Sequence, residues 1–325
     1  MKNVNYKSKY LEYLFLFLIL AFCFCLLFTK NYSSIVLDGT KLYFAIVFPS
    51  LFPFMFFSFI LSNLNATRKF SILFAPLTTR LFKTSGITAF AFFMSIISGY
   101  PIGAKVISEL KQNNLISNTD AIKGSTFCST SSPVFLISSV GGIMFSSTDF
   151  GIKLFFIHTF STIITGFIFS YYKRKEKIIK PASFKPVNND NLLYSGSLSA
   201  VTNVLTVGGL IVIFYLVINL IINTFVFKQI TSFVSPMFLT TNNATGFFAS
   251  LLELTTGLKI LSQNPNFLTL PLCAFLVSFG GLCIICQSIA FLKNAKIKTA
   301  PFVFSKLISA VLSFILALIC NLIFF

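Results

Sequence analysis

Two membrane-length apolar stretches of this chain are interrupted by small and polar residues, and each interruption carries a charge where lipid would surround it. The first runs from Ser98 to Lys105 and the second from Leu252 to Gly257. A backbone amide without a hydrogen-bond partner is costly in hydrocarbon, so a broken helix persists at membrane depth only where protein or a water-filled cavity covers it. The two interruptions therefore predict a cavity.

The composition supports a membrane protein with many spans. Of the 325 residues, 55% are hydrophobic and only 10% are charged, whereas about a quarter of the residues in a soluble domain are charged. The formal net charge of +17 comes from short Lys and Arg runs between apolar segments. We interpret these runs as topology signals, and we expect no nucleic-acid partner.

A helix needs about 20 apolar residues to cross a bilayer. The clear candidates are Tyr10 to Phe28, Leu42 to Leu61, Phe150 to Tyr172, Val201 to Phe225, Leu268 to Leu292 and Phe302 to Phe325. Shorter or interrupted stretches are Phe70 to Phe82, Ile87 to Leu110, Asp120 to Phe145, Ile230 to Leu239 and Gly246 to Leu261. The first span follows three lysines and has the alternative of a signal peptide, but no small-x-small cleavage site follows it, which favours an uncleaved helix.

Basic residues give the expected orientation in the cell membrane. The segment 173–185 is rich in Lys and Arg, which predicts a cytoplasmic central loop. With the amino terminus also inside, the simplest path has a re-entrant hairpin at 87–115 and one crossing at 120–145. A second re-entrant hairpin at 246–261 then leaves the carboxyl terminus outside.

This path repeats one order of elements: long span, short amphipathic piece, broken hairpin, interrupted span, long span. We therefore expect an all-α fold with two inverted-topology repeats containing broken or re-entrant helices, an architecture that brackets a midplane site in many transporters. The predicted divisions are residues 1–38 (an amino-terminal helix and outer loop), 39–172 (first repeat), 173–200 (basic linker) and 201–325 (second repeat). Ser139 to Gly142 and Ser278 to Gly281 occupy the fourth element of each copy, although such small residues also serve helix packing.

The first hairpin tip carries several candidate substrate-binding residues. Gly99 and Gly103 permit unusual backbone angles, and Pro101 ends a helix, so the tip, with Tyr100, is either a tight turn or a solute-facing one. Lys105 and Glu109 are spaced to pair on one helix face. They either balance charge at the site or lie at the membrane interface.

Glu253 is the candidate that most strongly suggests a function, because an acid inside a membrane span points to a functional site. It would bind a proton or cation, with Thr255 supplying a neutral oxygen and Gly257 shaping the tip; the alternative is a structural hydrogen bond. Further candidates are Ser129, Thr130, Ser131, Ser278, Gly280 and Gly281. Of these, the hydroxyls near Pro133 serve either a ligand or the backbone groups that a kink releases.

Other polar residues are weaker candidates. His158 and Gln287 are single polar groups in spans, which favours helix-to-helix contacts. The Cys283 and Cys286 pair lies in an apolar span, which favours packing over metal or redox chemistry. With one histidine in the chain, we expect no metal, no cofactor and no enzymatic acid-base cluster.

The blocks Gly99 to Lys105, Ser131 to Ile137, Leu252 to Gly257 and Ser278 to Leu282 resemble the signature stretches of YlbJ-type sporulation integral membrane proteins. That family is grouped with nucleoside-recognition Gate domains, and the resemblance covers most of the chain from about Gly39. Two positions depart from it: Ser129 stands where an asparagine is expected, and Ile284 to Cys286 replace a stretch expected to contain histidine.

The resemblance implies a bacterial spore-former and a role in forming the spore cortex or envelope. Together with the predicted cavity, the resemblance favours a permease for a small solute or ion. We expect membrane lipid to be the other molecule that the chain contacts. The alternative is a scaffold that transports nothing and recruits sporulation partners through surface loops such as 171–186.

Overall fold

The computed structural model describes residues 32–63, 66–172 and 191–324, together with the isolated positions 16, 17, 20, 24 and 26. Within these ranges the regular elements are all helical, which confirms the all-α prediction. The first half contains α2 (Tyr32–Leu42), η1 (Tyr43–Val47), α3 (Phe48–Asn63), α4 (Ala66–Leu77), η2 (Thr78–Phe82), α5 (Thr88–Ser98), α6 (Ile102–Gln112), α7 (Asn118–Phe127), η3 (Val134–Met144) and α8 (Thr148–Phe169). The second half contains α9 (Leu192–Ile222), α10 (Phe225–Phe238), α11 (Thr241–Leu252), α12 (Leu254–Leu261), α13 (Thr269–Phe279), α14 (Gly281–Asn294) and α15 (Ala300–Phe324).

Several helical stretches are long and apolar enough to cross a membrane, so the chain is a multi-pass membrane protein. In the described residues they are Tyr32–Leu61, Thr148–Phe169, Leu192–Ile222, Thr269–Asn294 and Ala300–Ile323. The stretch that contains the predicted span Leu42 to Leu61 is helical from Tyr32, the first residue described there. The helix predicted from Val201 begins earlier, at Leu192, because hydropathy marks the apolar part of a helix and not its ends. The predicted span Tyr10 to Phe28 lies largely outside the described residues, as does 173–190 of the basic linker.

The same order of elements occurs in both halves. A long helical stretch, a short helix, a hairpin, an interrupted helix and a long helix appear first from α2 to α8 and again from α9 to α15. The hairpins are α5 with α6 and α11 with α12, and the members of each pair contact one another. The opposed orientation of the two copies stays a prediction.

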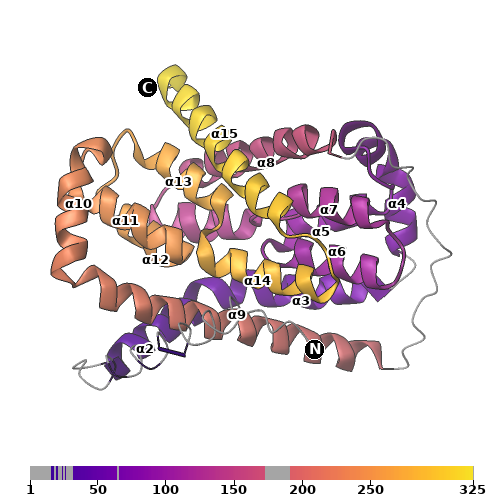
Figure 1. Cartoon of the computed structure of the whole chain (residues 1–325), viewed down its shortest axis with the longest axis horizontal. Helices are drawn as coiled ribbons and strands as arrows, with labels where there is room; N and C mark the ends of the chain where they lie inside the picture. The colour runs from indigo at the N-terminus through magenta and orange to yellow at the C-terminus, as the bar shows by residue number, and fades with distance from the viewer. Residues whose placement is uncertain are drawn as a thin grey trace, which may run out of the picture.

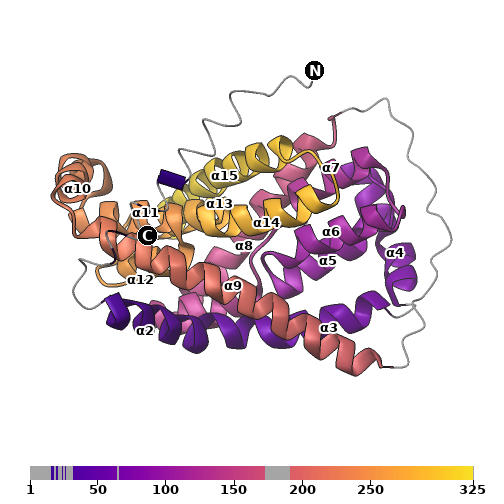
Figure 2. The same ribbon diagram turned by 60° about the horizontal axis from the view of Figure 1, so that its bottom comes forward.

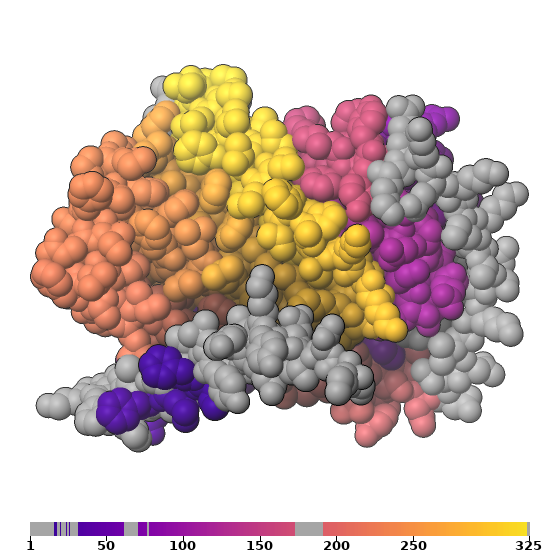
Figure 3. Space-filling model, viewed as in Figure 1, coloured from indigo at the N-terminus to yellow at the C-terminus, as the bar shows by residue number. Residues whose placement is uncertain are grey.

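The two halves meet along two sides of the molecule. On one side, α9 runs beside α2 and α3 (Figures 1 and 2). On the other, α15 packs on α13 of its own half and on α7 and α8 of the first half. The space-filling view shows α15, in yellow, between the orange and magenta parts of the surface (Figure 3). The hairpins and interrupted helices of both halves lie between these two contact regions.

Glycine permits two of the breaks. Gly99 ends α5 with φ 76° and Gly280 separates α13 from α14 with φ 88°, a backbone region that residues with a Cβ atom rarely adopt. Gly99 is followed by a cis peptide bond between Tyr100 and Pro101. The break at Glu253 is of another kind, because its backbone is extended (φ −137°, ψ 120°) and its side chain caps the next helix.

Parts of two predicted interruptions are helical instead. Ser139 to Gly142 lies inside η3. The break in the α7–η3 element lies instead at Cys128 to Pro133, between the two helices. Gly141 serves packing there, since a Cβ atom on it would lie 2.7 Å from Gly151 Cα. Thr255 to Gly257 likewise belongs to α12, because the Glu253 cap starts that helix at Leu254.

Candidate functional site

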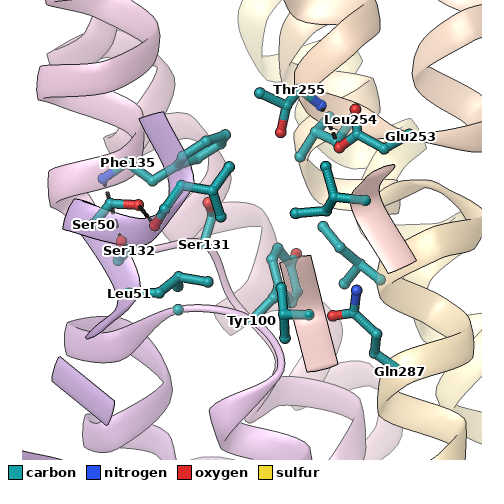
Figure 4. Close-up of a pocket in the computed structure, with 15 residues that line it drawn as sticks. Ser50, Leu51, Tyr100, Ser131, Ser132, Phe135, Glu253, Leu254, Thr255 and Gln287 are labelled. Carbon is teal, nitrogen blue, oxygen red and sulfur yellow. Dashed lines mark hydrogen bonds between the residues drawn. The ribbon is translucent and has the colours of Figure 1, made fainter. Parts of the chain in front are cut away.

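A cavity of about 50 Å³ lies where the breaks of the two halves come together (Figure 4). In the figure, Tyr100 lies between Ser131, Ser132 and Phe135 on one side and Glu253, Leu254 and Thr255 on the other. The lining residues are Val47, Ser50, Leu51, Gly99, Tyr100, Ser131, Ser132, Phe135, Val207, Ile211, Glu253, Leu254, Thr255, Ile284 and Gln287. Polar groups from both halves thus face one small, largely apolar chamber.

Tyr100 links the first hairpin tip to the second half. Its hydroxyl donates to the Val277 carbonyl at 3.2 Å, near the end of α13. The preceding Gly99 lies against the break in the α7–η3 element, since a Cβ atom there would lie 2.9 Å from Ser132 N. The tip is therefore held by the interrupted helices of both halves.

Glu253 caps the helix that follows it. Its Oε1 accepts from Thr255 N at 2.9 Å, and its Oε2 accepts from Thr256 N and from Thr256 Oγ1, each at 2.7 Å. A carboxylate at this position also interacts favourably with the positive end of the helix dipole. The alternative of a structural hydrogen bond is therefore present. Glu253 makes it to α12, the helix that it caps, and not to a neighbouring helix. The carboxylate also lines the cavity.

The backbone of the break between α7 and η3 is bound by side chains from other helices. His158 Nε2 on α8 accepts from Ser131 N at 3.0 Å, and its Nδ1 lies 2.8 Å from Ser278 Oγ on α13. Because a backbone N–H can only donate, His158 is unprotonated at Nε2. The interpretation of His158 as a helix-to-helix contact is confirmed.

Lys306 binds the same break from α15. Its Nζ donates to the Ser129 carbonyl and to Tyr100 Oη, the latter at 3.1 Å. Two of the backbone groups that the kink releases, Ser131 N and the Ser129 carbonyl, are therefore bound by His158 and Lys306 and not by the neighbouring hydroxyls.

The cavity brings together some of the predicted site residues and leaves others outside its lining. Gly99, Tyr100, Ser131, Glu253 and Thr255 line it. The lining does not include Pro101, Gly103, Lys105, Glu109, Ser129, Thr130, Gly257, Ser278, Gly280 or Gly281. Of these, Ser129, Thr130 and Ser278 lie in the surrounding hydrogen-bond network, where Thr130 Oγ1 donates to Ser95 Oγ at 3.3 Å.

Lys105 and Glu109 pair as predicted but away from the cavity. Their charged atoms are 3.8 Å apart, and the Glu109 side chain is 42% exposed. Lys105 Nζ also donates to Ser199 Oγ on α9 at 3.2 Å. This pair joins α6 to α9 and does not contribute to the cavity lining.

Three predicted site glycines allow close packing around the breaks. A Cβ atom on Gly103 would lie 1.6 Å from the Cys128 carbonyl oxygen, and one on Gly257 would lie 1.9 Å from Ser250 Oγ. A Cβ atom on Gly281 would lie 2.7 Å from the Ser250 carbonyl oxygen. Gly103 and Gly281 each bring a hairpin close to an interrupted helix, and Gly257 brings together the two helices of the second hairpin.

Sequence reasoning missed several residues of this region. Ser50 and Ser132 line the cavity. Gln287, which was interpreted as a helix-to-helix contact, also lines the cavity, and its amide donates to Cys283 Sγ on its own helix at 3.3 Å instead of to another helix. Lys306 was missed because it follows shortly after Lys293, Lys296 and Lys298 and looks like an interfacial charge. Its place seven residues into a span was the available signal.

The chemistry of the site is that of a largely apolar chamber with a few polar groups. It offers hydroxyls, an amide, a phenol and a carboxylate, and within the described residues no group of three or more His, Cys, Asp or Glu side chains is placed to hold a metal ion. Cys283 and Cys286 are both free thiols.

Comparison with known proteins gives one relevant relative. The chain is homologous to the "Sporulation integral membrane protein YlbJ" of Bacillus subtilis (strain 168), with 27% identity over 303 residues that cover 84% of this chain and 73% of the relative. No family model matches the chain. No solved structure matches it.

Proposed function

We propose that this homologue of YlbJ is a sporulation-associated permease for a small solute or ion, and not an enzyme. The observation that carries the proposal is the cavity shared by the first hairpin tip, the break before η3 and the Glu253 cap. Irregular backbone at membrane depth requires cover by protein or water, and here it surrounds a chamber with polar groups from both halves. Such a chamber is the form that a solute site takes in transporters with broken helices.

The cavity volume limits the cargo in this conformation. By the same measure, a water molecule needs roughly 10–15 Å³, so about 50 Å³ holds a few waters or a small ion. Pockets for drug-sized ligands enclose about 300–1,000 Å³. A nucleoside-sized cargo, which the Gate grouping suggests, would require the hairpins to move apart.

The recurring element order supports a mechanism of alternating access. If the halves are inverted copies, each hairpin and interrupted helix can open toward one side of the membrane while the other pair stays closed. The proposed orientation has the amino terminus and the basic segment at 173–185 inside and the carboxyl terminus outside, following the distribution of Lys and Arg. Reporter fusions at both termini test that orientation.

The sporulation role rests on the name of the relative and on the homology. It is tested by complementing a spore-forming host that lacks its own homologue and counting heat-resistant spores. Variants of the cavity lining are compared with replacement of the segment 173–186. A permease predicts that the cavity variants fail and the loop variant succeeds; the reverse result supports the scaffold.

A direct assay uses the purified protein in liposomes. Fluxes of protons, alkali cations, chloride and phosphate are followed with ion-sensitive dyes trapped inside the vesicles. A flux that needs the protein and is lost on Gln287→Leu supports the permease. Absence of flux for these ions, combined with spore rescue by that same variant, contradicts it.

A further inference from the structure

Lys306 is a buried lysine within a membrane-length helix. Lys306 lies on α15 and is 3% exposed. A charge in this setting is costly unless it is paired. Within the described residues the ion pairs involve other lysines, namely Lys41 with Asp38, Lys105 with Glu109 and Lys153 with Asp149.

The groups around Lys306 are neutral. The Ser129 carbonyl and Tyr100 Oη accept from its Nζ. The same Nζ lies 4.3 Å from the centre of the Tyr100 ring and 5.7 Å from that of Phe302. Carbonyl oxygens, a hydroxyl and aromatic faces are ligands that also stabilise free monovalent cations.

The position relative to the broken helices adds a second argument. Ser129 directly follows Cys128, the C-cap of α7, and Tyr100 Oη also donates to Val277 near the end of α13. The carboxyl-terminal end of a helix carries partial negative charge. In transporters with broken helices, unwound carbonyls and such helix ends hold the coupling cation.

Among the described residues, one oxygen next to the Lys306 contacts has no hydrogen-bond partner. Ser129 Oγ is buried and makes no hydrogen bond within the described residues. It belongs to the residue whose carbonyl binds Lys306, so a free cation replacing the ammonium would find an additional neutral ligand there.

We infer that the Lys306 ammonium is a tethered cation in the position that a free alkali coupling cation would otherwise occupy. This inference rests on the proposed function, because a tethered cation would make the permease independent of Na⁺ and K⁺. It also predicts that the place becomes an alkali-cation site when the ammonium is removed.

The test compares the thermal unfolding midpoints of the detergent-purified full chain in NaCl, KCl and N-methyl-D-glucamine chloride at equal ionic strength. Wild-type protein is expected to unfold at one midpoint in all three salts. Lys306→Ala is expected to show a midpoint that rises with NaCl or KCl and saturates, by about 2–4 °C or more relative to the organic cation. Lys105→Ala removes an ion-paired lysine and is the matched control, with no alkali dependence expected.

Each outcome decides the inference. Alkali-dependent stability of Lys306→Ala, or its recovery in folded form only with Na⁺ or K⁺, supports it. Equal midpoints in all salts overturn it, as does an alkali-dependent wild type. If Lys306→Ala is not recovered in any salt, Lys306→Ser is measured in its place, and failure to recover that variant as well overturns the inference. Because the readout is stability, it can fail while liposome flux is still observed.

Discussion

The Tyr100 hydroxyl lies 3.2 Å from the Val277 carbonyl oxygen and donates to it across the boundary between the two halves. One side chain at the first hairpin tip therefore reaches the interrupted helix of the opposite half, while also lining the cavity and contacting Lys306. The breaks act together as one connected structure, and the following predictions test its parts.

Glu253→Gln is expected to reduce both helix capping and function. The two carboxylate oxygens of Glu253 accept three hydrogen bonds. The glutamine amide has only one acceptor oxygen, so the substitution should lower the free energy of unfolding by about 1–2 kcal/mol. Thermal unfolding and spore complementation measure the two effects. Glu109→Gln is the matched control, because Glu109 is half-exposed outside the cavity, and it should complement fully. Wild-type spore counts for Glu253→Gln would remove Glu253 from the mechanism.

Gly103→Ala is expected to destabilise the fold. The new methyl group would lie 1.6 Å from the Cys128 carbonyl oxygen, and such overpacking costs about 1–3 kcal/mol or more. Gly209→Ala, in α9, meets nothing within 4 Å and should be neutral or stabilising by about 0.5–1 kcal/mol. Thermal unfolding in detergent compares them. Equal unfolding midpoints for the two variants would contradict the close approach of α6 to the Cys128 carbonyl at the end of α7.

His158 and Ser278 are expected to be energetically coupled. Their side chains are 2.8 Å apart, and His158 also accepts from Ser131 N. His158→Phe leaves that buried amide unpaired, at about 1–3 kcal/mol, and a double-mutant cycle with Ser278→Ala should give a coupling of at least about 0.5 kcal/mol. Strictly additive effects on unfolding would show that the two residues do not interact.

Gln287→Leu is expected to separate stability from function. The Gln287 amide oxygen is buried without a partner in the described residues, so an apolar side chain of similar size should leave the unfolding midpoint unchanged or raise it. The cavity loses a polar lining group, so spore complementation should fall. A variant that is both more stable and fully active would show that this amide has no role in permeation.

Much of the fold could be predicted because the signals are local. The breaks near Gly99 and Gly280 follow from glycine, and the hairpin turning after Ser98 follows from Pro101. The helix over Thr255 to Gly257 could not be predicted, because a glycine and two threonines look like a break until the Glu253 cap is seen to start α12.

The composition of the site was harder to predict because it depends on contacts between distant residues. Lys306 and Ser129 are 177 positions apart, as are Tyr100 and Val277. Lys105 and Glu109 lie within the first hairpin, on α6, yet Lys105 binds Ser199 on α9 and neither residue lines the cavity. Sequence spacing identified the tips, whereas tertiary packing decided which polar residues surround the cavity.

The most direct measurement of the central claim is the reactivity of single cysteines with silver ion, a thiol-reactive monovalent cation. In a background without the seven native cysteines, Ser132→Cys and Thr255→Cys report on the cavity from the first and second half. Val140→Cys and Leu258→Cys are the controls, because both positions are fully buried and absent from the lining. A shared hydrated cavity predicts that silver blocks the thiols at positions 132 and 255 and spares those at 140 and 258. Equal protection at all four positions would contradict it.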